Sequence, residues 1–115
     1  MALNLAAIAT ITGLSAVHVN SGTAIGTLLA TPSANTVHKL NSLYVANTTT
    51  VLTADVYITR SAVLGYICKT LSVTANTTTV VITKDSPIYM EPGDVLFVVG
   101  SATGLVFTVS YETLA

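Results

Sequence analysis

Two histidines are the first residues in this sequence that could bind a metal ion or transfer protons. His18 and His38 lie far apart in the chain. Zinc sites usually draw their ligands from short spacings such as H-x-H or H-E-x-x-H, and neither spacing occurs here. The sequence therefore predicts no metal site, and we expect both histidines at the surface or in an interface.

Two carboxylates, Glu91 and Asp94, bracket a Pro-Gly pair and could be considered as calcium ligands. Calcium takes about six to eight oxygen ligands, more than this pair provides. Pro92 presets φ for the second position of a type II turn, and Gly93 accepts the positive φ of the third position. We therefore interpret Pro92, Gly93 and Asp94 as a structural turn in which Asp94 accepts backbone N–H groups. The same turn occurs in cupin-type jelly rolls, but the H-x-H metal motif of those enzymes is missing.

Nucleophilic chemistry has little support in the sequence. The single cysteine, Cys68, lies in the apolar run 63–68 and cannot form an internal disulfide, so we expect a small core residue. No G-x-S-x-G motif is present, and carboxylates are too few for an acid–base pair to be expected. The sequence predicts a protein that is not an enzyme and needs no cofactor.

The composition indicates an unusual surface. Charged residues make up only 8% of the 115 residues, the mean hydropathy is +0.74, and there are 20 threonines. An ordinary globular domain carries about 25% charged residues. Two interpretations are open: a surface that other protein chains cover, which we favour, or a monomer solvated by its hydroxyl groups.

The charge pattern also excludes some partners. The net charge is −1, and the four Lys and Arg residues are scattered singly, so direct nucleic-acid binding is not expected. The N-terminus lacks the basic residues that begin a signal peptide, and no apolar run approaches the roughly 18 residues of a membrane helix. We expect neither nucleic acid nor membrane as a partner.

Short alternating segments predict strands along most of the chain. The clearest is 52–59, where apolar and polar residues alternate with a period of two. Eight or nine such segments recur, with no helical period, and the apolar run 95–99 is typical of a central strand. The pattern predicts an all-β fold, an antiparallel β-sandwich of jelly-roll or immunoglobulin-like type, over residues 14–115.

The N-terminal segment 1–13 contains small apolar residues without a clear period. It is interpreted either as an arm that packs on a neighbouring chain or as an edge strand of the same domain, and the two alternatives are weighted equally. The candidate interface residues of this arm are Ala2, Leu3, Leu5, Ile8 and Ile11.

Asparagines interrupt the strand pattern at three places. Asn41 has the same parity as apolar neighbours in the strand 36–46, which predicts a bulge or a strand end. The hexapeptide Ala-Asn-Thr-Thr-Thr-Val occurs at 46–51 and again at 75–80. Because the flanking residues do not align, we interpret this repeat as shared turn chemistry rather than a duplicated hairpin.

Four segments together carry a resemblance to a known class of proteins. They are Ile11-Thr12-Gly13, Leu40-Asn41-Ser42-Leu43-Tyr44-Val45-Ala46-Asn47, Ser86-Pro87-Ile88-Tyr89-Met90-Glu91-Pro92-Gly93-Asp94 and Val109-Ser110-Tyr111-Glu112. The chain resembles the small all-β virion structural proteins of tailed bacteriophages, particularly phages of marine bacteria and cyanobacteria. Those proteins often show an N-S-L-x-V-A-N strand, a P-I-Y-x-x-x-G-D turn and a final S-Y-E strand.

The resemblance implies a non-enzymatic role in a virion that is assembled in the host cytoplasm. Together with the charge-poor surface, it leads us to expect a capsid decoration (cement) protein. We expect a homo-oligomer, specifically a trimer, in contact with the phage major capsid protein or neighbouring virion proteins. A neck, collar, tail or fibre component is the alternative. A carbohydrate-binding module on a fibre ranks lower, because the chain has five Tyr but no Trp.

Overall fold

The computed structural model describes residues 8–115, and in this range the chain forms nine β-strands and no helix. No segment within this range is a helix long and apolar enough to cross a membrane. The predicted all-β antiparallel sandwich is confirmed. The strands are β1 (Ile11–Val19), β2 (Gly26–Leu29), β3 (Val37–Asn47), β4 (Leu52–Arg60), β5 (Val63–Val73), β6 (Thr77–Ile82), β7 (Ile88–Met90), β8 (Val95–Gly100) and β9 (Leu105–Leu114).

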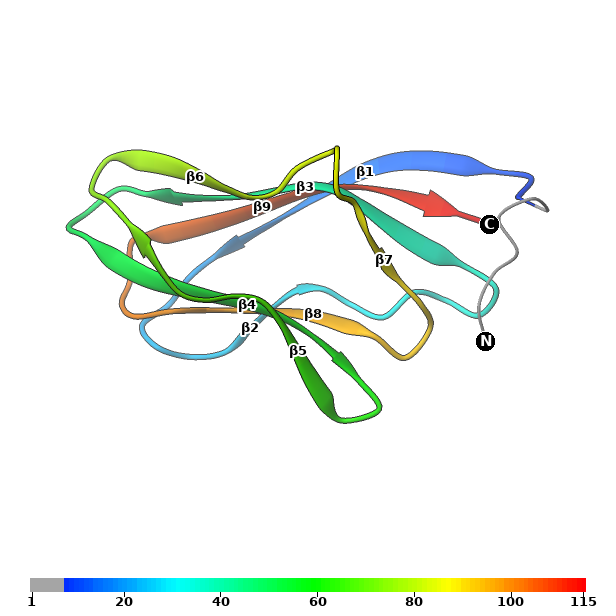
Figure 1. Ribbon diagram of the computed structural model, residues 1–115, viewed down its shortest axis with the longest axis horizontal. Coiled ribbons are helices and arrows are strands. Elements are labelled where there is room, and N and C mark those ends of the chain that lie inside the picture. The colour runs from blue at the N-terminus through cyan, green and yellow to red at the C-terminus, as the bar shows by residue number, and fades with distance from the viewer. Residues whose placement is uncertain (1–7) are drawn as a thin grey trace.

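The strands form two sheets that pack face to face (Figure 1). The five-stranded sheet has the order β1-β9-β3-β6, with the short β7 also paired to β3. The four-stranded sheet has the order β2-β8-β4-β5. Every strand pair is antiparallel.

The pairings identify the sandwich as a jelly roll. β4 pairs with β5, β3 with β6, β2 with β8 and β1 with β9, so each pair encloses the previous one along the chain. The chain is thus one long hairpin folded into two sheets. The pairing of β3 with β9 joins two of these strand pairs in the five-stranded sheet, and the pairing of β4 with β8 joins the other two in the four-stranded sheet. Jelly rolls have this nested arrangement. The structure therefore has the jelly-roll alternative and not the immunoglobulin-like one.

The core lies between the sheets and follows the alternation of the strands. In β4, Ala54 and Val56 are buried while Leu52 and Ile58 pack partly against the core, on the face that the sequence predicted. Phe107 in β9 is the largest fully buried side chain. Burial of such side chains is the main source of stability in a chain of this size.

A bulge in β3 keeps its leucines in the core. The register between β3 and β9 shifts between Leu40 and Ser42, so Asn41 is the extra residue that the sequence predicted as a bulge or strand end. Because one residue is inserted, Leu40 and Leu43 both face inward and are fully buried, although their parity differs. The Asn41 side chain donates a hydrogen bond to Glu112 Oε1 at 2.8 Å.

The beginning of the described chain belongs to the sandwich. Ile11 to Gly13 form the first part of β1 and lie opposite Leu114 to Glu112 of β9, at the edge of the five-stranded sheet. Ile8 precedes this strand. The other candidate arm residues, Ala2, Leu3 and Leu5, lie outside the described residues.

The two hexapeptide copies are used differently. Asn47 is buried, and its side-chain amide donates to the carbonyl groups of Thr50 and Val73 at 2.6 and 2.9 Å. Asn76 instead has a φ of 55° in the turn before β6. Both are turn roles for asparagine, as interpreted from the sequence, but the geometries are unrelated.

Candidate functional site: the uncharged face of the five-stranded sheet

The outer face of the five-stranded sheet exposes apolar side chains in a row that crosses four strands. Residues directly opposite one another in an antiparallel sheet point to the same side. The strand registers align one such row, which consists of Val17, Thr108, Tyr44 and Val80. Val17 and Val80 are 62% and 55% exposed, so the row is open to solvent at both ends.

Two further rows flank it. The registers place Val19, Val106, Ala46 and Thr78 in one row, and Ser15, Ser110 and Ser42 in the other. None of these residues carries a charge. We call the three rows together the uncharged face; its members are Ser15, Val17, Val19, Ser42, Tyr44, Ala46, Thr78, Val80, Val106, Thr108 and Ser110.

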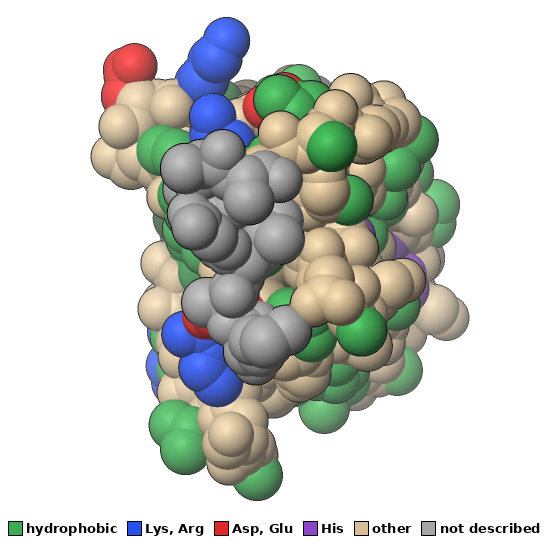
Figure 2. All heavy atoms as spheres, turned by 90° about the vertical axis from the view of Figure 1, so that its right-hand side faces the viewer, with side chains coloured by type: hydrophobic (Ala, Val, Ile, Leu, Met, Phe, Trp, Pro, Cys, Tyr) green, Lys and Arg blue, Asp and Glu red, His purple; other side chains and the backbone are tan. Residues whose placement is uncertain are grey.

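Charged groups limit this face at one end. Glu112 lies opposite both Gly13 and Lys39, and the Lys39 ammonium is 4.0 Å from the Glu112 carboxylate. Figure 2 looks at that end of the molecule and shows charged side chains on the left and along the top, with none visible on the right. The charge-free flank is consistent with β1 and β2, which contain no Asp, Glu, Lys or Arg.

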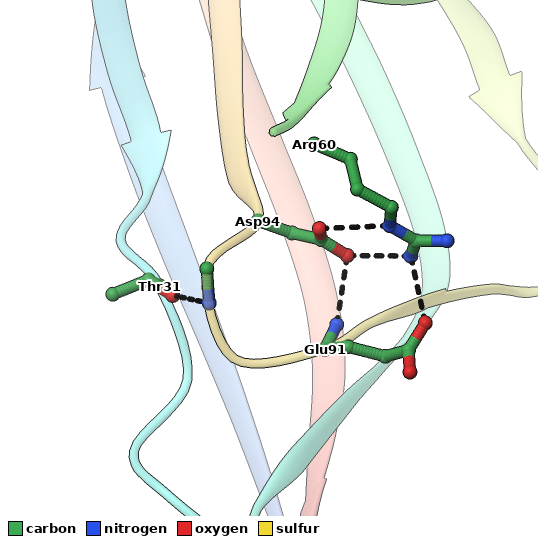
Figure 3. Close-up of polar contacts among 5 residues, drawn as sticks. Thr31, Arg60, Glu91 and Asp94 are labelled. Carbon is green, nitrogen blue, oxygen red and sulfur yellow. Dashed lines mark hydrogen bonds and ion pairs between the residues drawn. The ribbon is translucent and has the colours of Figure 1, made fainter. Parts of the chain in front are cut away.

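The Pro-Gly turn before β8 has the geometry of a type II turn. Gly93 has a φ of 99°, and the Asp94 N–H donates to the Glu91 carbonyl at 3.0 Å. The Gly93 N–H donates to Thr31 Oγ1 at 2.6 Å, which ties the turn to the segment after β2 (Figure 3). Pro92, Gly93 and Asp94 therefore stand together as a structural turn.

Asp94 is nearly fully buried, and all its contacts are structural. Arg60 donates to both carboxylate oxygens, from Nε at 2.9 Å and from Nη2 at 2.6 Å (Figure 3). The Glu91 N–H adds a third hydrogen bond at 2.9 Å. The Arg60 hydrogen bond, more than any other contact, holds the pKa of Asp94 below its usual value. A carboxylate occupied in this way is not available as a catalytic base.

Arg60 was not singled out from the sequence. It ends β4, and its Nη2 also lies 3.0 Å from Glu91 Oε2, so one guanidinium joins both carboxylates of the turn. The available signal was indirect: an aspartate next to an apolar strand needs a partner if it is buried. Only four cations exist in the chain, but nothing in the spacing selects this one.

The two histidines lie on different strands and are not brought together. His18 lies opposite Phe107 and covers Gly26, whereas His38 lies opposite Thr113 and packs against Tyr111, with ring centroids 5.1 Å apart and the rings tilted by 49°. Burial lowers the pKa of His38. Among residues 8–115 there is no group of three His, Cys, Asp or Glu side chains that could hold a metal ion.

The outer face of the four-stranded sheet carries an aromatic cluster. The Tyr57 ring lies 5.3 Å from Tyr66 and 5.4 Å from Phe97, and the Lys69 ammonium is 4.6 Å from the centre of the Tyr66 ring. A shallow depression of about 220 Å³ lies on the same sheet, lined by Thr23, Thr53, Asp55, Val99, Gly100 and Ser101. Cys68 of this sheet packs partly against the core, and burial raises its pKa.

Comparisons with known proteins concern the fold. No family model and no curated protein matches the chain. Among solved structures it is similar to a chain in the structure of infectious bursal disease virus, Gx strain, with a TM-score of 0.52 and 12% sequence identity. The match covers 93% of this chain and 32% of the viral chain, so this chain spans about a third of that protein's length. At this identity the likeness concerns the fold alone.

Proposed function

We propose that this chain is a virion structural protein, and specifically a capsid decoration protein without enzymatic activity. The observation that carries the proposal is the uncharged face, where Val17, Tyr44 and Val80 are exposed in one row without an ionised group among their neighbours. The exposed valines and Tyr44 of this face are interspersed with serine and threonine, and a surface with exposed apolar groups and no charge is typical of one that another molecule covers.

The size of the face is adequate for a specific contact. The domain measures 46 × 26 × 19 Å, and Figure 1 shows the two sheets stacked along the intermediate dimension, so a whole outer sheet face of 46 × 19 Å is comparable to the roughly 800 Å² per partner that a stable protein interface buries. At about 25 cal/mol per Å², a few hundred Å² of apolar contact contributes several kcal/mol before the costs of docking. Repeated over many copies, such contacts would brace a shell against internal pressure.

Two further observations support a virion role. The fold is similar to part of a chain from a virus structure. The sequence segments resemble structural proteins of tailed phages, which supports the phage major capsid protein or a neighbouring virion protein as the partner. On this proposal the protein is located in the virion and assembled in the host cytoplasm.

The proposal is tested by counting this chain in purified virions with quantitative mass spectrometry. Hundreds of copies are expected for a decoration protein. A dozen or fewer copies would support a neck, collar or tail component instead. Complete absence of the chain from purified virions would overturn a virion role.

A matched pair of variants tests the face itself. Tyr44 and Tyr66 are exposed to a similar degree, 37% and 45%, on the outer faces of opposite sheets. The Tyr44→Glu variant should lose binding to particles that lack the chain, as measured by co-sedimentation, while Tyr66→Glu should bind like the native protein. Equal binding by both variants would show that the uncharged face is not the contact surface.

The aromatic cluster supports a second candidate, a carbohydrate-binding module on a fibre. Stacking of sugar rings on exposed tyrosines needs a surface such as Tyr66 with its neighbours Tyr57 and Phe97. The rings are tilted by 54° and 32° and Tyr57 is largely buried, so the cluster is not a flat platform. Specific binding on a glycan array that Tyr66→Ala abolishes would establish this function over the first.

A further inference from the structure

The edge strand β1 presents a regular set of backbone groups away from its sheet. Thr10 and Ala115 exchange two backbone hydrogen bonds of 2.9 and 3.0 Å, and the Asn20 N–H donates to the Leu105 carbonyl at 2.9 Å. The register between these points is unbroken. Because hydrogen-bonded residues alternate along an antiparallel strand, the even-numbered residues bond to β9. The odd-numbered residues direct their N–H and C=O groups to the open side: Ile11, Gly13, Ser15, Val17 and Val19.

Other edge strands of the sandwich carry features that oppose pairing with another chain. β2 has four residues, and its register with β8 shifts between Thr27 and Leu29. β5 contains Lys69, a positive φ of 54° at Thr70 and two register shifts against β4. Short length, a lysine and bulges are the usual protections of an edge. β6 has six residues and one register shift against β3.

β1 has none of these protections. It is nine residues long, contains no charged residue and no proline, and keeps one register along its whole length. Its odd-numbered side chains are exposed, including two valines and an isoleucine. Among residues 8–115, β9 is the strand that pairs with β1, and it covers one side of it. Such a strand is a template for the addition of another strand.

We propose that the open edge of β1 binds β1 of a second copy of this chain in an antiparallel arrangement around a two-fold axis at Ser15. In this register Ser15 lies opposite Ser15 of the second copy. Ile11 lies opposite Val19 of the second copy, and Gly13 opposite Val17. All five outward-facing residues on each strand then donate and accept one backbone hydrogen bond.

The character of the strand favours its own copy as the occupant. A two-fold axis brings identical residues together near its centre, so a charged strand would repel itself. β1 contains no Asp, Glu, Lys or Arg, and serine at the axis is small enough to face itself. The register also pairs β-branched side chains across the interface, which stabilises antiparallel strands.

The pairing would join the two five-stranded sheets into one. The axis stands perpendicular to the sheet, so both uncharged faces lie on the same side and become continuous. This closed pair differs from the trimer expected from the sequence. It does not depend on the identity of the shell partner.

The experiment uses the full chain and analytical ultracentrifugation over a range of concentrations. The native protein should sediment as a dimer at micromolar concentration. Ser15→Lys places two like charges opposite each other and should weaken the dimer by about ten- to hundred-fold in Kd. The control is Ser72→Lys, because Ser72 is also an exposed serine on an edge strand, β5 of the other sheet, and this variant should remain dimeric.

Charge complementation tests the register. Ser15→Glu alone should also be weakened, and an equimolar mixture of Ser15→Glu and Ser15→Lys should regain the dimer. A native protein that stays monomeric at micromolar concentration, or that forms a trimer, would overturn the proposal. Equal effects of Ser15→Lys and Ser72→Lys, or a mixture that stays monomeric, would also overturn it. Circular dichroism of each variant verifies that the sandwich is folded. The dimer is measured without the shell, so failure of the native protein to bind the shell would count against the proposed function and not against the dimer.

Discussion

The Arg60–Asp94 pair allows a quantitative prediction. Asp94 is 1% exposed, so replacing Arg60 with methionine leaves a buried carboxylate that keeps one hydrogen bond, from the Glu91 N–H. Removing one partner of a fully buried pair costs about 3–5 kcal/mol. The Arg60 side chain is 57% exposed and solvent screens its charge, so we expect a smaller loss of about 2 kcal/mol in the free energy of unfolding.

The assay is urea denaturation followed by circular dichroism, with thermal unfolding as a second measurement. A loss of about 2 kcal/mol corresponds to a fall of roughly 6–12 °C in Tm for a domain of this size. The matched control is Lys39→Met. Lys39 also faces a carboxylate, Glu112, but at 4.0 Å, and its loss should cost less than about 0.5 kcal/mol.

The pH dependence gives a further criterion. Because the folded-state pKa of Asp94 is lowered, its ion pair contributes stability above the unfolded value of about 3.9. That contribution disappears as the pH falls through the folded-state pKa. The difference between native protein and Arg60→Met should therefore be complete at pH 7 and shrink in acid, as Asp94 becomes protonated first in the variant and then in the native protein. A difference that is under about 0.5 kcal/mol at pH 7, or that persists unchanged in acid, would refute this account of the turn.

Two further predictions concern the turn at 61–62 and the histidine in β3. Ser61 and Ala62 have φ values of 51° and 65° between paired residues of β4 and β5, a conformation that favours Asn-Gly, so the double substitution Ser61→Asn/Ala62→Gly should stabilise the fold by about 1 kcal/mol in thermal denaturation. A lower Tm would contradict that reasoning. Burial lowers the folded-state pKa of His38, so the unfolded chain binds its proton more readily and stability should fall as the pH drops below the unfolded value of about 6.5. The His38→Gln variant should lose this part of the pH dependence between pH 7 and 5. If the urea midpoint of the variant changes with pH in the same way as that of the native protein, burial of His38 is not the cause.

Local features of the fold could be predicted from the sequence because their causes are local. The alternation in β4 predicts the buried face that Ala54 and Val56 occupy. The chemistry of Pro92 and Gly93 predicts the turn that precedes β8. In these cases the information lies within a few residues, where side-chain period and allowed φ values decide the conformation.

The order of strands in the sheets could not be predicted in the same way. β1 and β9 pair although they come from opposite ends of the described chain, and no local pattern specifies such a partner. The immunoglobulin-like alternative therefore remained open until the pairings were known. The sequence left residues 1–13 open between an arm and an edge strand, because small residues such as Gly13 carry a weak strand signal, and in the structure Ile11 to Gly13 form the first part of β1.

The candidate site depends on the same distant pairings. Parity within one strand indicates which side chains face outward, but it does not align Val17 with Thr108, Tyr44 and Val80. The composition correctly indicated a surface poor in charge. Only the strand registers show that the exposed uncharged residues gather on one face of the five-stranded sheet. The contact between Arg60 and Asp94 could not be predicted for the same reason, since it joins residues 34 positions apart in the chain.

The nested order of the jelly roll has a consequence for how the chain folds. The entropy lost in closing a loop rises with the separation of its ends, so the β4–β5 hairpin closes most cheaply and β1–β9 closes over the longest stretch of chain. We expect the ladder to zip outward from β4–β5, with β1 joining last and fraying first. A neighbour bound to the open edge of β1 would suppress this fraying and so stabilise the strand pair that forms last.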